Sequence, residues 1–288
     1  MNLKELLQHF TIELQDIYGA EEVSSIFYIT TDHISGFSRA VTILKGAELL
    51  SEQQESAYLK VLARLKTGKP IQYILEETVF YGLPFKVTPA VLIPRPETEE
   101  LVEWVIESSA LAEVTGSSLR IIDIGTGSGC IAVSLKKYLP LSEVSALDVS
   151  KEAIEVASGN ASLNQVDVNF IEADIREFST RQKFDVIVSN PPYITEKEEE
   201  QMHHNVLDHE PHMALFVPNE KPLLFYEAIA DFASVSLSDM GLLFFEINEH
   251  YGKEMIDMLR SKSFINIELK KDMQGKDRMI KCQRAIAL

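Results

Sequence analysis

The sequence contains few cysteines and no long apolar run. Cys130 and Cys282 are its two cysteines, which excludes a scaffold held together by several disulfides. No stretch of roughly 18 apolar residues occurs, which excludes an ordinary membrane-spanning helix. Lys4, Glu5 and His9 interrupt any early apolar stretch, so no signal peptide is visible. We therefore expect a cytoplasmic protein without membrane contact.

The sequence is also poor in basic residues. It has 27 Lys and Arg against 44 Asp and Glu, a formal net charge of −17 over 288 residues. Because binding to phosphate backbones depends mainly on cationic side chains that displace counterions, this charge argues against extended nucleic-acid binding. The composition, 45% hydrophobic and 25% charged, is that of a globular protein, and the length suits one large or two moderate domains.

The spacing of apolar residues predicts two structural regions joined by a connector. Residues 1–75 show helical periodicity and predict a small helical domain, which we expect to recognise a substrate. Ser51 and Gln54 match a capping box, so a helix is predicted from Ser51 to Lys66. Residues 76–95 carry β-forming residues interleaved with glycine and proline, and they predict a hairpin connector.

The third region, residues 96–288, alternates strand-like and helical segments. This alternation predicts an α/β fold with a doubly wound, mostly parallel sheet. Basic residues between 270 and 284 alternate with Ile280 and Cys282, which favours a final surface strand. The other predicted segments are Leu119–Ile124, Ile131–Tyr138, Glu143–Leu147, Lys151–Leu163, Asn169–Glu172, Phe184–Ser189, Leu223–Ser236 and Leu242–Ile247.

A glycine-rich turn follows the first of these strands. Its residues are Gly125, Thr126, Gly127, Ser128 and Gly129. Alternate glycines permit a tight turn and let a ligand approach the backbone. The turn lacks the Gly-Lys-Ser/Thr ending of a Walker loop, and its third glycine comes one position too early for a dinucleotide fingerprint. A tight turn without a ligand is the alternative.

Two acidic residues indicate what this turn binds. Asp148 ends a strand about twenty residues after the last glycine, where a carboxylate accepts hydrogen bonds from ribose hydroxyls. Asp123 precedes the glycines, where a negative charge disfavours a pyrophosphate and suits an ammonium or sulfonium. S-adenosylmethionine meets both conditions, so we expect it as the cofactor and S-adenosylhomocysteine as its product.

A second corner follows the strand Phe184–Ser189 and consists of Asn190, Pro191, Pro192 and Tyr193. The two prolines fix the backbone and remove two amide donors. The Asn190 side-chain oxygen and the Pro191 carbonyl then form two rigid acceptors for a planar NH2 group, against which Tyr193 stacks. The alternative is a strand end with a core aromatic, but ligands bind at the carboxyl ends of such strands.

The segment after this corner is rich in histidine. His203, His204, His209 and His212 lack the spacing of a familiar zinc site, and no cysteine accompanies them. We expect no metal there. A polar loop that includes the acidic run Glu196–Glu200 and acts as a mobile lid is the favoured interpretation.

These motifs carry a resemblance to a known family. The glycine turn, Asp148 and the Asn190–Tyr193 corner resemble class I, Rossmann-like methyltransferases that act on exocyclic amino or amide nitrogens. Two further segments are similar to those of the release factor glutamine N5-methyltransferases, the HemK or PrmC family: Leu92-Ile93-Pro94-Arg95-Pro96-Glu97-Thr98-Glu99, and Glu210-Pro211 with Ala214-Leu215. The resemblance runs from about Ile71 to the end of the chain.

The resemblance implies a reaction and a set of site residues. The substrate would be the glutamine of the Gly-Gly-Gln motif in class 1 peptide chain release factors. The donor would be lined by the glycine turn, with Asp148 on the ribose, Asp174 and Ile175 beside the adenine, and Asn190 close by. Residues placed by the resemblance at the substrate are Arg95, Pro96, Glu97, Thr98, Asn190, Pro191, Pro192 and Tyr193, of which the last four form the catalytic corner.

The sequence departs from the family pattern at two places. Many relatives carry an aromatic residue where this chain has Ile175. Many also carry Glu-x-Gly-x-x-Gln where this chain has Glu246 to Tyr251, so no role is assigned to that stretch.

Two other functions remain open from the sequence. A DNA or RNA adenine N6-methyltransferase would use the same corner on a flipped base, although it would need a basic recognition surface. A donor-binding module without chemistry would not need the Asn190–Tyr193 corner at all. For methyl transfer to an amide, no general base is expected, because the corner acts by positioning.

Overall fold

The computed structural model describes residues 1–202 and 204–285. Within this part of the chain there are two compact units. The smaller unit holds Met1–Glu77 together with the short helix α9 (His204–His209), and the larger unit holds the other described residues.

The smaller unit is helical, and two of its described helices begin at a capping box. Asn2 and Ser51 each cap a helix through a capping box, and the Ser51 hydroxyl accepts the Gln54 amide at 3.2 Å. The predicted helix is therefore confirmed, with Ser51 and Lys66 as its two caps. Its core packs Phe10 and Phe27 edge to face. Besides α9, the helices are α1 (Leu3–Leu14), α2 (Ala20–Ser35), α3 (Arg39–Leu44), α4 (Glu52–Leu65) and α5 (Ile71–Leu75).

A hairpin follows the first five helices in the sequence. Strands β1 (Glu77–Phe80) and β2 (Leu83–Lys86) pair with each other. Tyr81 and Gly82 between them both have positive φ, 49° and 73°. Two central residues of this kind match the right-handed twist of hairpin strands, so the two-residue turn closes the predicted connector.

The larger unit is built on a mostly parallel sheet, as predicted. In the described residues the sheet has seven strands in the order β10-β11-β9-β6-β3-β4-β5, and all neighbours from β9 to β5 are parallel. The strands are β3 (Arg120–Ile124), β4 (Glu143–Asp148), β5 (Asn169–Glu172), β6 (Phe184–Ser189), β9 (Leu237–Glu246), β10 (Phe264–Lys271) and β11 (Asp277–Arg284).

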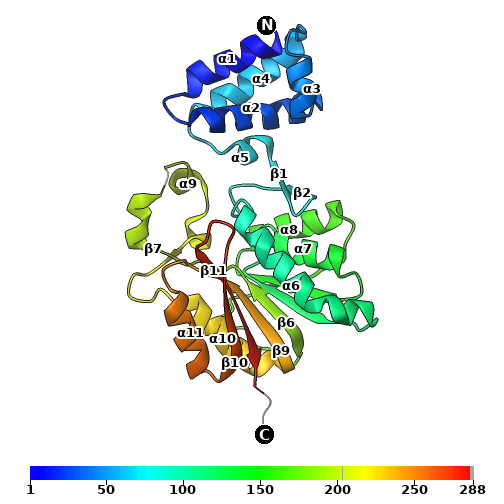
Figure 1. Cartoon of the computed structure of the whole chain (residues 1–288), viewed down its shortest axis with the longest axis vertical. Coiled ribbons are helices and arrows are strands. Elements are labelled where there is room, and N and C mark those ends of the chain that lie inside the picture. Colours follow the sequence, from blue (N-terminus) through cyan, green and yellow to red (C-terminus); the bar gives the residue numbers. More distant parts are fainter. Residues whose placement is uncertain (203, 286–288) are drawn as a thin grey trace. The chain divides into compact units, whose positions relative to one another are not determined.

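Helices cover both faces of this sheet, which makes the fold doubly wound (Figure 1). Alternate strand residues point to opposite faces, so Ile121 packs under α6, α7 and α8 while Ile122 packs under α10 and α11. Both isoleucines are completely buried. The helices are α6 (Pro96–Val114), α7 (Cys130–Tyr138), α8 (Lys151–Leu163), α10 (Leu224–Ser236) and α11 (Gly252–Ser261).

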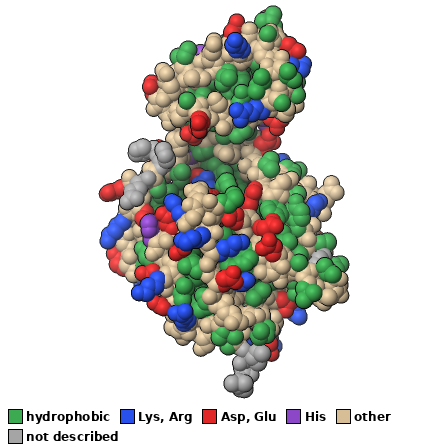
Figure 2. Space-filling model, viewed as in Figure 1, with side chains coloured by type: hydrophobic (Ala, Val, Ile, Leu, Met, Phe, Trp, Pro, Cys, Tyr) green, Lys and Arg blue, Asp and Glu red, His purple; other side chains and the backbone are tan. Residues whose placement is uncertain are grey.

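One strand prediction is wrong in its position. The last strand, β11, is not a surface strand, because it lies inside the sheet between β10 and β9 and runs antiparallel to both. Ile280 and Cys282 are completely buried as a result. The sequence resembles a surface strand because alternate residues are charged, but ion pairs such as Lys281–Glu268 (3.1 Å) and Lys271–Asp277 (2.8 Å) accommodate them. On the molecular surface that Figure 2 shows, basic and acidic side chains are interspersed.

The segment after the Asn190–Tyr193 corner has secondary structure of its own. Strands β7 (Ile194–Thr195) and β8 (Phe216–Val217) pair in parallel, and the 3-10 turns η1 (Glu196–Gln201) and η2 (His212–Ala214) lie between them in the sequence. The acidic run of the predicted polar loop thus forms the turn η1, which is held by a capping box between Thr195 and Glu198. Motion as a lid stays a prediction.

Candidate active site

The sheet topology places two turns side by side. From β3 the chain continues outward through β4 and β5, then returns to β6 on the other side of β3. This reversal creates a crevice at the carboxyl ends of β3 and β6, where ligands of open α/β sheets bind. In the strand register Ile124 is the partner of Ser189. The glycine turn and the Asn190 corner, which follow directly, therefore begin at neighbouring positions on one edge of the sheet.

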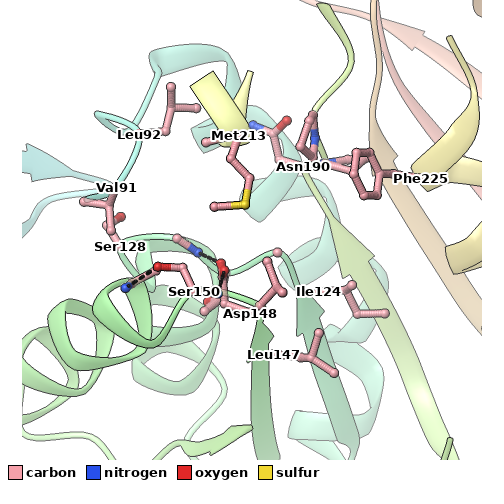
Figure 3. Close-up of a pocket in the computed structure, with 18 of the residues that line it drawn as sticks. Val91, Leu92, Ile124, Ser128, Leu147, Asp148, Ser150, Asn190, Met213 and Phe225 are labelled. Atoms are coloured by element: carbon pink, nitrogen blue, oxygen red, sulfur yellow. Dashed lines mark hydrogen bonds between the residues drawn. The ribbon is translucent and has the colours of Figure 1, made fainter. Parts of the chain in front are cut away.

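A cavity of about 260 Å³ opens at this edge and is formed entirely by the larger unit. Figure 3 shows Asp148 and Asn190 on different sides of it, with the Met213 side chain between them. Of the predicted site residues, those that line the cavity are Arg95, Thr98, Gly125, Thr126, Gly127, Ser128, Asp148, Asp174, Ile175, Asn190, Pro191 and Pro192.

The glycines of the turn have two different structural roles. Gly125 and Gly127 have φ angles of 74° and 54°, and a Cβ at either position would meet no described atom within 4 Å. They leave open space for a ligand. Gly129 is not among the residues that line the cavity. It faces α8 instead, and a Cβ at this position would lie 3.0 Å from the Ala157 Cβ. Ligand contact by Gly129 stays a prediction, and the structure shows that this glycine permits close packing of the start of α7 against α8.

Asp148 is fixed in place by backbone amides. Its two carboxylate oxygens accept the Gly127 amide at 2.8 Å and the Ser150 amide at 2.9 Å (Figure 3). Burial raises the pKa of this carboxyl above its ordinary value, and the backbone hydrogen bonds oppose that shift. Each oxygen keeps a second lone pair, so the carboxylate retains the capacity to accept two hydroxyl groups of a ligand.

Asp123 lies beneath the turn rather than on the cavity wall. It is completely buried, and its Oδ2 accepts the Thr126 hydroxyl at 2.6 Å. Burial raises the pKa of this carboxyl to about 7, a shift that the Thr126 hydrogen bond opposes. The structure thus shows Asp123 supporting the turn through Thr126, and its contact with a ligand stays a prediction.

The adenine-side prediction concerns Asp174 and Ile175, and both line the cavity. The Asp174 carboxylate accepts the Arg176 Nε at 3.0 Å, and this hydrogen bond lowers the pKa of Asp174. The Ile175 side chain is one of several apolar groups on this wall, together with Leu147 and Ile229.

The Asn190 corner presents its amide in a defined way. The Asn190 Nδ2 donates to the Thr98 hydroxyl at 3.2 Å. Tyr193 is not among the residues that line the cavity. Its ring packs against the core between the sheet and the helices α10 and α11, and its hydroxyl donates to Glu246 at 3.1 Å. Burial raises the pKa of the Tyr193 phenol further above its ordinary range. Stacking of a substrate on Tyr193 stays a prediction, and the structure shows the ring partly buried against the core, with its hydroxyl held by Glu246.

Glu246 is a residue to which the sequence assigned no role. It is 1% exposed at the end of β9, and its Oε2 accepts the Thr98 hydroxyl at 2.6 Å. Burial raises the pKa of its carboxyl, and the hydrogen bond from Thr98 and the charge of Arg278 oppose that shift. A carboxylate at the carboxyl end of a buried strand next to the ligand crevice was the available sequence signal.

The Pro-Arg-Pro-Glu-Thr run divides at the start of α6. Arg95 and Thr98 line the cavity, whereas Pro96 begins the helix and Glu97 accepts a hydrogen bond from Gln274 outside it. Pro96 and Glu97 are not among the residues that line the cavity, and their contact with a substrate stays a prediction. Proline suits the first helical position because an N–H at that position would have no acceptor within the helix.

Arg95 also connects the two segments that flank the cavity. Its Nη2 donates to the buried Glu210 carboxylate at 2.6 Å, and the Ile93 amide donates to the other Glu210 oxygen at 3.4 Å. Glu210 therefore fixes the Arg95 segment to the segment that carries Met213.

Sequence reasoning missed several apolar lining residues. Met213, Phe225, Val91 and Leu92 lie around the cavity (Figure 3). Leu92 lies in the segment that carries the family resemblance, but Met213 and Phe225 carry no sequence signal because they reach the cavity only through folding of the chain after the corner.

Two further features concern only the part of the chain that the structure describes, residues 1–202 and 204–285. Among the side chains that the structure describes, no group of three or more His, Cys, Asp or Glu is arranged to hold a metal ion. His203, one of the four histidines considered from the sequence, lies outside the described residues. No helix in the same residues has both the length and the apolar character needed to cross a membrane.

Comparison with known proteins agrees with this geometry. Residues 107–213 match the Methyltransferase small domain, and residues 5–75 match the PrmC N-terminal domain. The structure also resembles a T. thermophilus 16S rRNA methyltransferase solved in complex with AdoMet and guanosine. That match has a TM-score of 0.52 at 17% identity and covers 72% of this chain and 49% of the other. The fold and the paired turns define a class I methyltransferase.

Two relatives are similar over nearly the whole chain. The release factor glutamine methyltransferase of Flavobacterium psychrophilum is 48% identical over 98% of this chain and 99% of its own length. That of Bacteroides thetaiotaomicron is 42% identical over 94% of this chain and 96% of its own length. The chain belongs to the release factor glutamine methyltransferase family.

Proposed function

We propose that this protein transfers a methyl group from S-adenosylmethionine to the side-chain amide nitrogen of the glutamine in the Gly-Gly-Gln motif of class 1 peptide chain release factors. The main support is the neighbouring placement of the glycine turn and Asn190 on one edge of the sheet. Family membership supports the same substrate, because the relatives are named for it.

The residues present fit the methyl donor. Gly125 and Gly127 leave space above the turn, and Asp148 keeps unused acceptor capacity beside it. The apolar wall with Ile175 provides a surface for a planar base. When bound, S-adenosylmethionine supplies an electrophilic methyl group on a sulfonium.

The Asn190 corner would orient the nucleophile. A carboxamide nitrogen reacts poorly because its lone pair is delocalised into the carbonyl. The Asn190 Oδ1 and the Pro191 carbonyl would accept the two amide hydrogens. These hydrogen bonds would increase the negative charge on the nitrogen and would orient it towards the methyl group. The donor would supply the methyl carbon to the amide nitrogen and keep the electron pair of the carbon–sulfur bond on its sulfur, and the nitrogen would release one proton.

The corner itself needs no general base. Among the described lining residues the carboxylates are Asp148 and Asp174, and both already accept hydrogen bonds from neighbouring groups. S-adenosylhomocysteine and a singly methylated amide are the products.

The test is a methyl-transfer assay with labelled donor and a purified release factor. Mass spectrometry should find one added methyl on the Gly-Gly-Gln glutamine, and a release factor with that glutamine replaced by alanine should accept none. Asn190→Ala should lower kcat by roughly 10²-fold while the donor Kd stays within a few-fold, because one preorganised contact to the reacting group is lost. Methylation of DNA or RNA adenine instead of the release factor, in a parallel assay, would contradict the proposal.

A further inference from the structure

A chain of hydrogen bonds runs from the catalytic corner into the protein interior. The Asn190 Nδ2 donates to the Thr98 Oγ1 at 3.2 Å, and the Thr98 hydroxyl donates to the Glu246 Oε2 at 2.6 Å. Thr98 is 3% exposed and Glu246 is 1% exposed. These contacts join three segments that are distant in sequence: the start of α6, the end of β6 and the end of β9.

We propose that Thr98 and Glu246 are positioning residues that fix which end of the Asn190 carboxamide faces the substrate. This inference rests on the proposed function, because it assumes that the Asn190 oxygen accepts a hydrogen from the substrate amide.

The direction of each hydrogen bond follows from the chemistry of the groups. An ionised carboxylate only accepts hydrogen bonds, and a hydroxyl has one hydrogen to donate. The Thr98 hydrogen is given to Glu246, so Thr98 offers Asn190 only lone pairs. Asn190 must then present its NH2 to Thr98, which directs its oxygen away from Thr98. A flipped amide would place its oxygen against the Thr98 lone pairs.

Glu246 is itself anchored, so it holds the Thr98 hydroxyl in one orientation. Its Oε1 accepts the Tyr193 hydroxyl at 3.1 Å, and its backbone carbonyl accepts the Tyr226 hydroxyl at 3.1 Å. The carboxylate therefore contacts both Tyr193 of the corner and the Thr98 that contacts Asn190. A half-satisfied buried network is costly, whereas a satisfied one defines a single arrangement.

The test compares variants at Thr98 in the full chain. Thr98→Val keeps the side-chain shape but removes the hydroxyl, so Asn190 loses the acceptor that orients it. We expect kcat to fall at least about tenfold, with the S-adenosylmethionine Kd and the release factor KM within about threefold of wild type. Thr98→Ser restores the hydroxyl and should recover most of the lost turnover.

A double-mutant cycle separates positioning from general damage. Because Thr98 acts through Asn190, adding Thr98→Val to Asn190→Ala should lower kcat by less than about twofold further. The matched control is Ser109→Ala on the same helix, since Ser109 is 3% exposed and its hydroxyl has no partner among the described residues. This control should leave kcat unchanged.

A second variant covers the case in which Thr98→Val fails to fold. Glu246→Leu removes both acceptor oxygens, so the Thr98 hydrogen is no longer fixed and can turn towards either end of the Asn190 carboxamide. We expect kcat to fall while the donor Kd is retained, and a wild-type kcat in this variant would overturn the inference.

A measurement without substrate distinguishes failure of this inference from failure of the proposed function. The side-chain amide signal of Asn190 in a 1H–15N NMR spectrum, assigned by its loss in Asn190→Ala, should shift in Thr98→Val and return in Thr98→Ser. Absence of methylation by the wild type would refute only the proposed function. An unshifted Asn190 signal together with unchanged kcat in Thr98→Val would overturn the positioning role.

Discussion

Replacing the third glycine of the turn tests the assignment of Gly129 to packing and Gly127 to ligand space. Gly129→Ala places a methyl group 3.0 Å from the Ala157 Cβ and 3.2 Å from its Cα, on a backbone with φ of 79°. Gly127→Ala also has a positive φ, 54°, but its methyl group would meet no described atom within 4 Å. The two substitutions therefore share the conformational cost and differ in the steric one.

The magnitudes follow from these two contributions. A left-handed conformation costs a residue with a Cβ about 1–2 kcal/mol, which applies to both variants. Overpacking in a well-packed interior costs a further 1–3 kcal/mol or so, which applies only to Gly129→Ala. The free energy of unfolding should thus fall by about 2–5 kcal/mol in Gly129→Ala, which lowers Tm by roughly 5–15 °C for a unit of this size. Gly127→Ala should lose about 1–2 kcal/mol.

Urea and thermal unfolding followed by circular dichroism measure these values, and calorimetry measures the donor Kd. Gly127→Ala should weaken donor binding strongly while remaining folded. Adding Ala157→Gly to Gly129→Ala removes the closest contact, so the two changes should be less destabilising together than the sum of each alone. Equal stability of Gly129→Ala and Gly127→Ala would refute the packing assignment.

Two further predictions concern the buried carboxylates. Asp148→Asn should raise the S-adenosylmethionine Kd about 10- to 150-fold, as measured by calorimetry. The substitution removes a charged acceptor worth about 1.5–3 kcal/mol, and its new NH2 faces a backbone amide donor. A wild-type Kd would contradict the ribose role. For Asp123, the pKa is raised from its ordinary value to about 7, so the native state holds a proton that the unfolded state releases, and stability is lost as pH rises from about 4 to about 7. Urea unfolding across this range should show that loss, up to about 4 kcal/mol, in the wild type and not in Asp123→Asn; parallel curves for the two proteins would show that the shift is absent.

The local elements of the larger unit were readable from the sequence because local rules determine them. The predicted strands Asn169–Glu172 and Phe184–Ser189 match the bounds of β5 and β6 residue for residue. The prediction for β11 failed because charged side chains on a buried strand can be accommodated by ion pairs, and the partners of those pairs lie on other segments.

Side-chain direction separates the site residues that were foreseen from those that were not. Asp148 is the last residue of β4, and Gly127 and Asn190 lie shortly after the ends of β3 and β6, so the parallel sheet brings all three to one edge wherever their side chains point. Tyr193 lies in the same corner, but its hydroxyl donates to Glu246, and the spacing of residues in the sequence does not predict that side-chain direction.

By itself, the sequence determined the alternation of strands and helices, the two turns and the chemistry that they can hold, because these depend on residues adjacent in the chain. Only the tertiary structure decided that Gly129 packs against a helix, that Asp123 lies beneath the turn, and that Thr98 links Glu246 to Asn190. Each of these contacts joins side chains whose separation in space is determined by how the sheet is assembled, and burial then decides whether a polar group faces a ligand or another part of the protein.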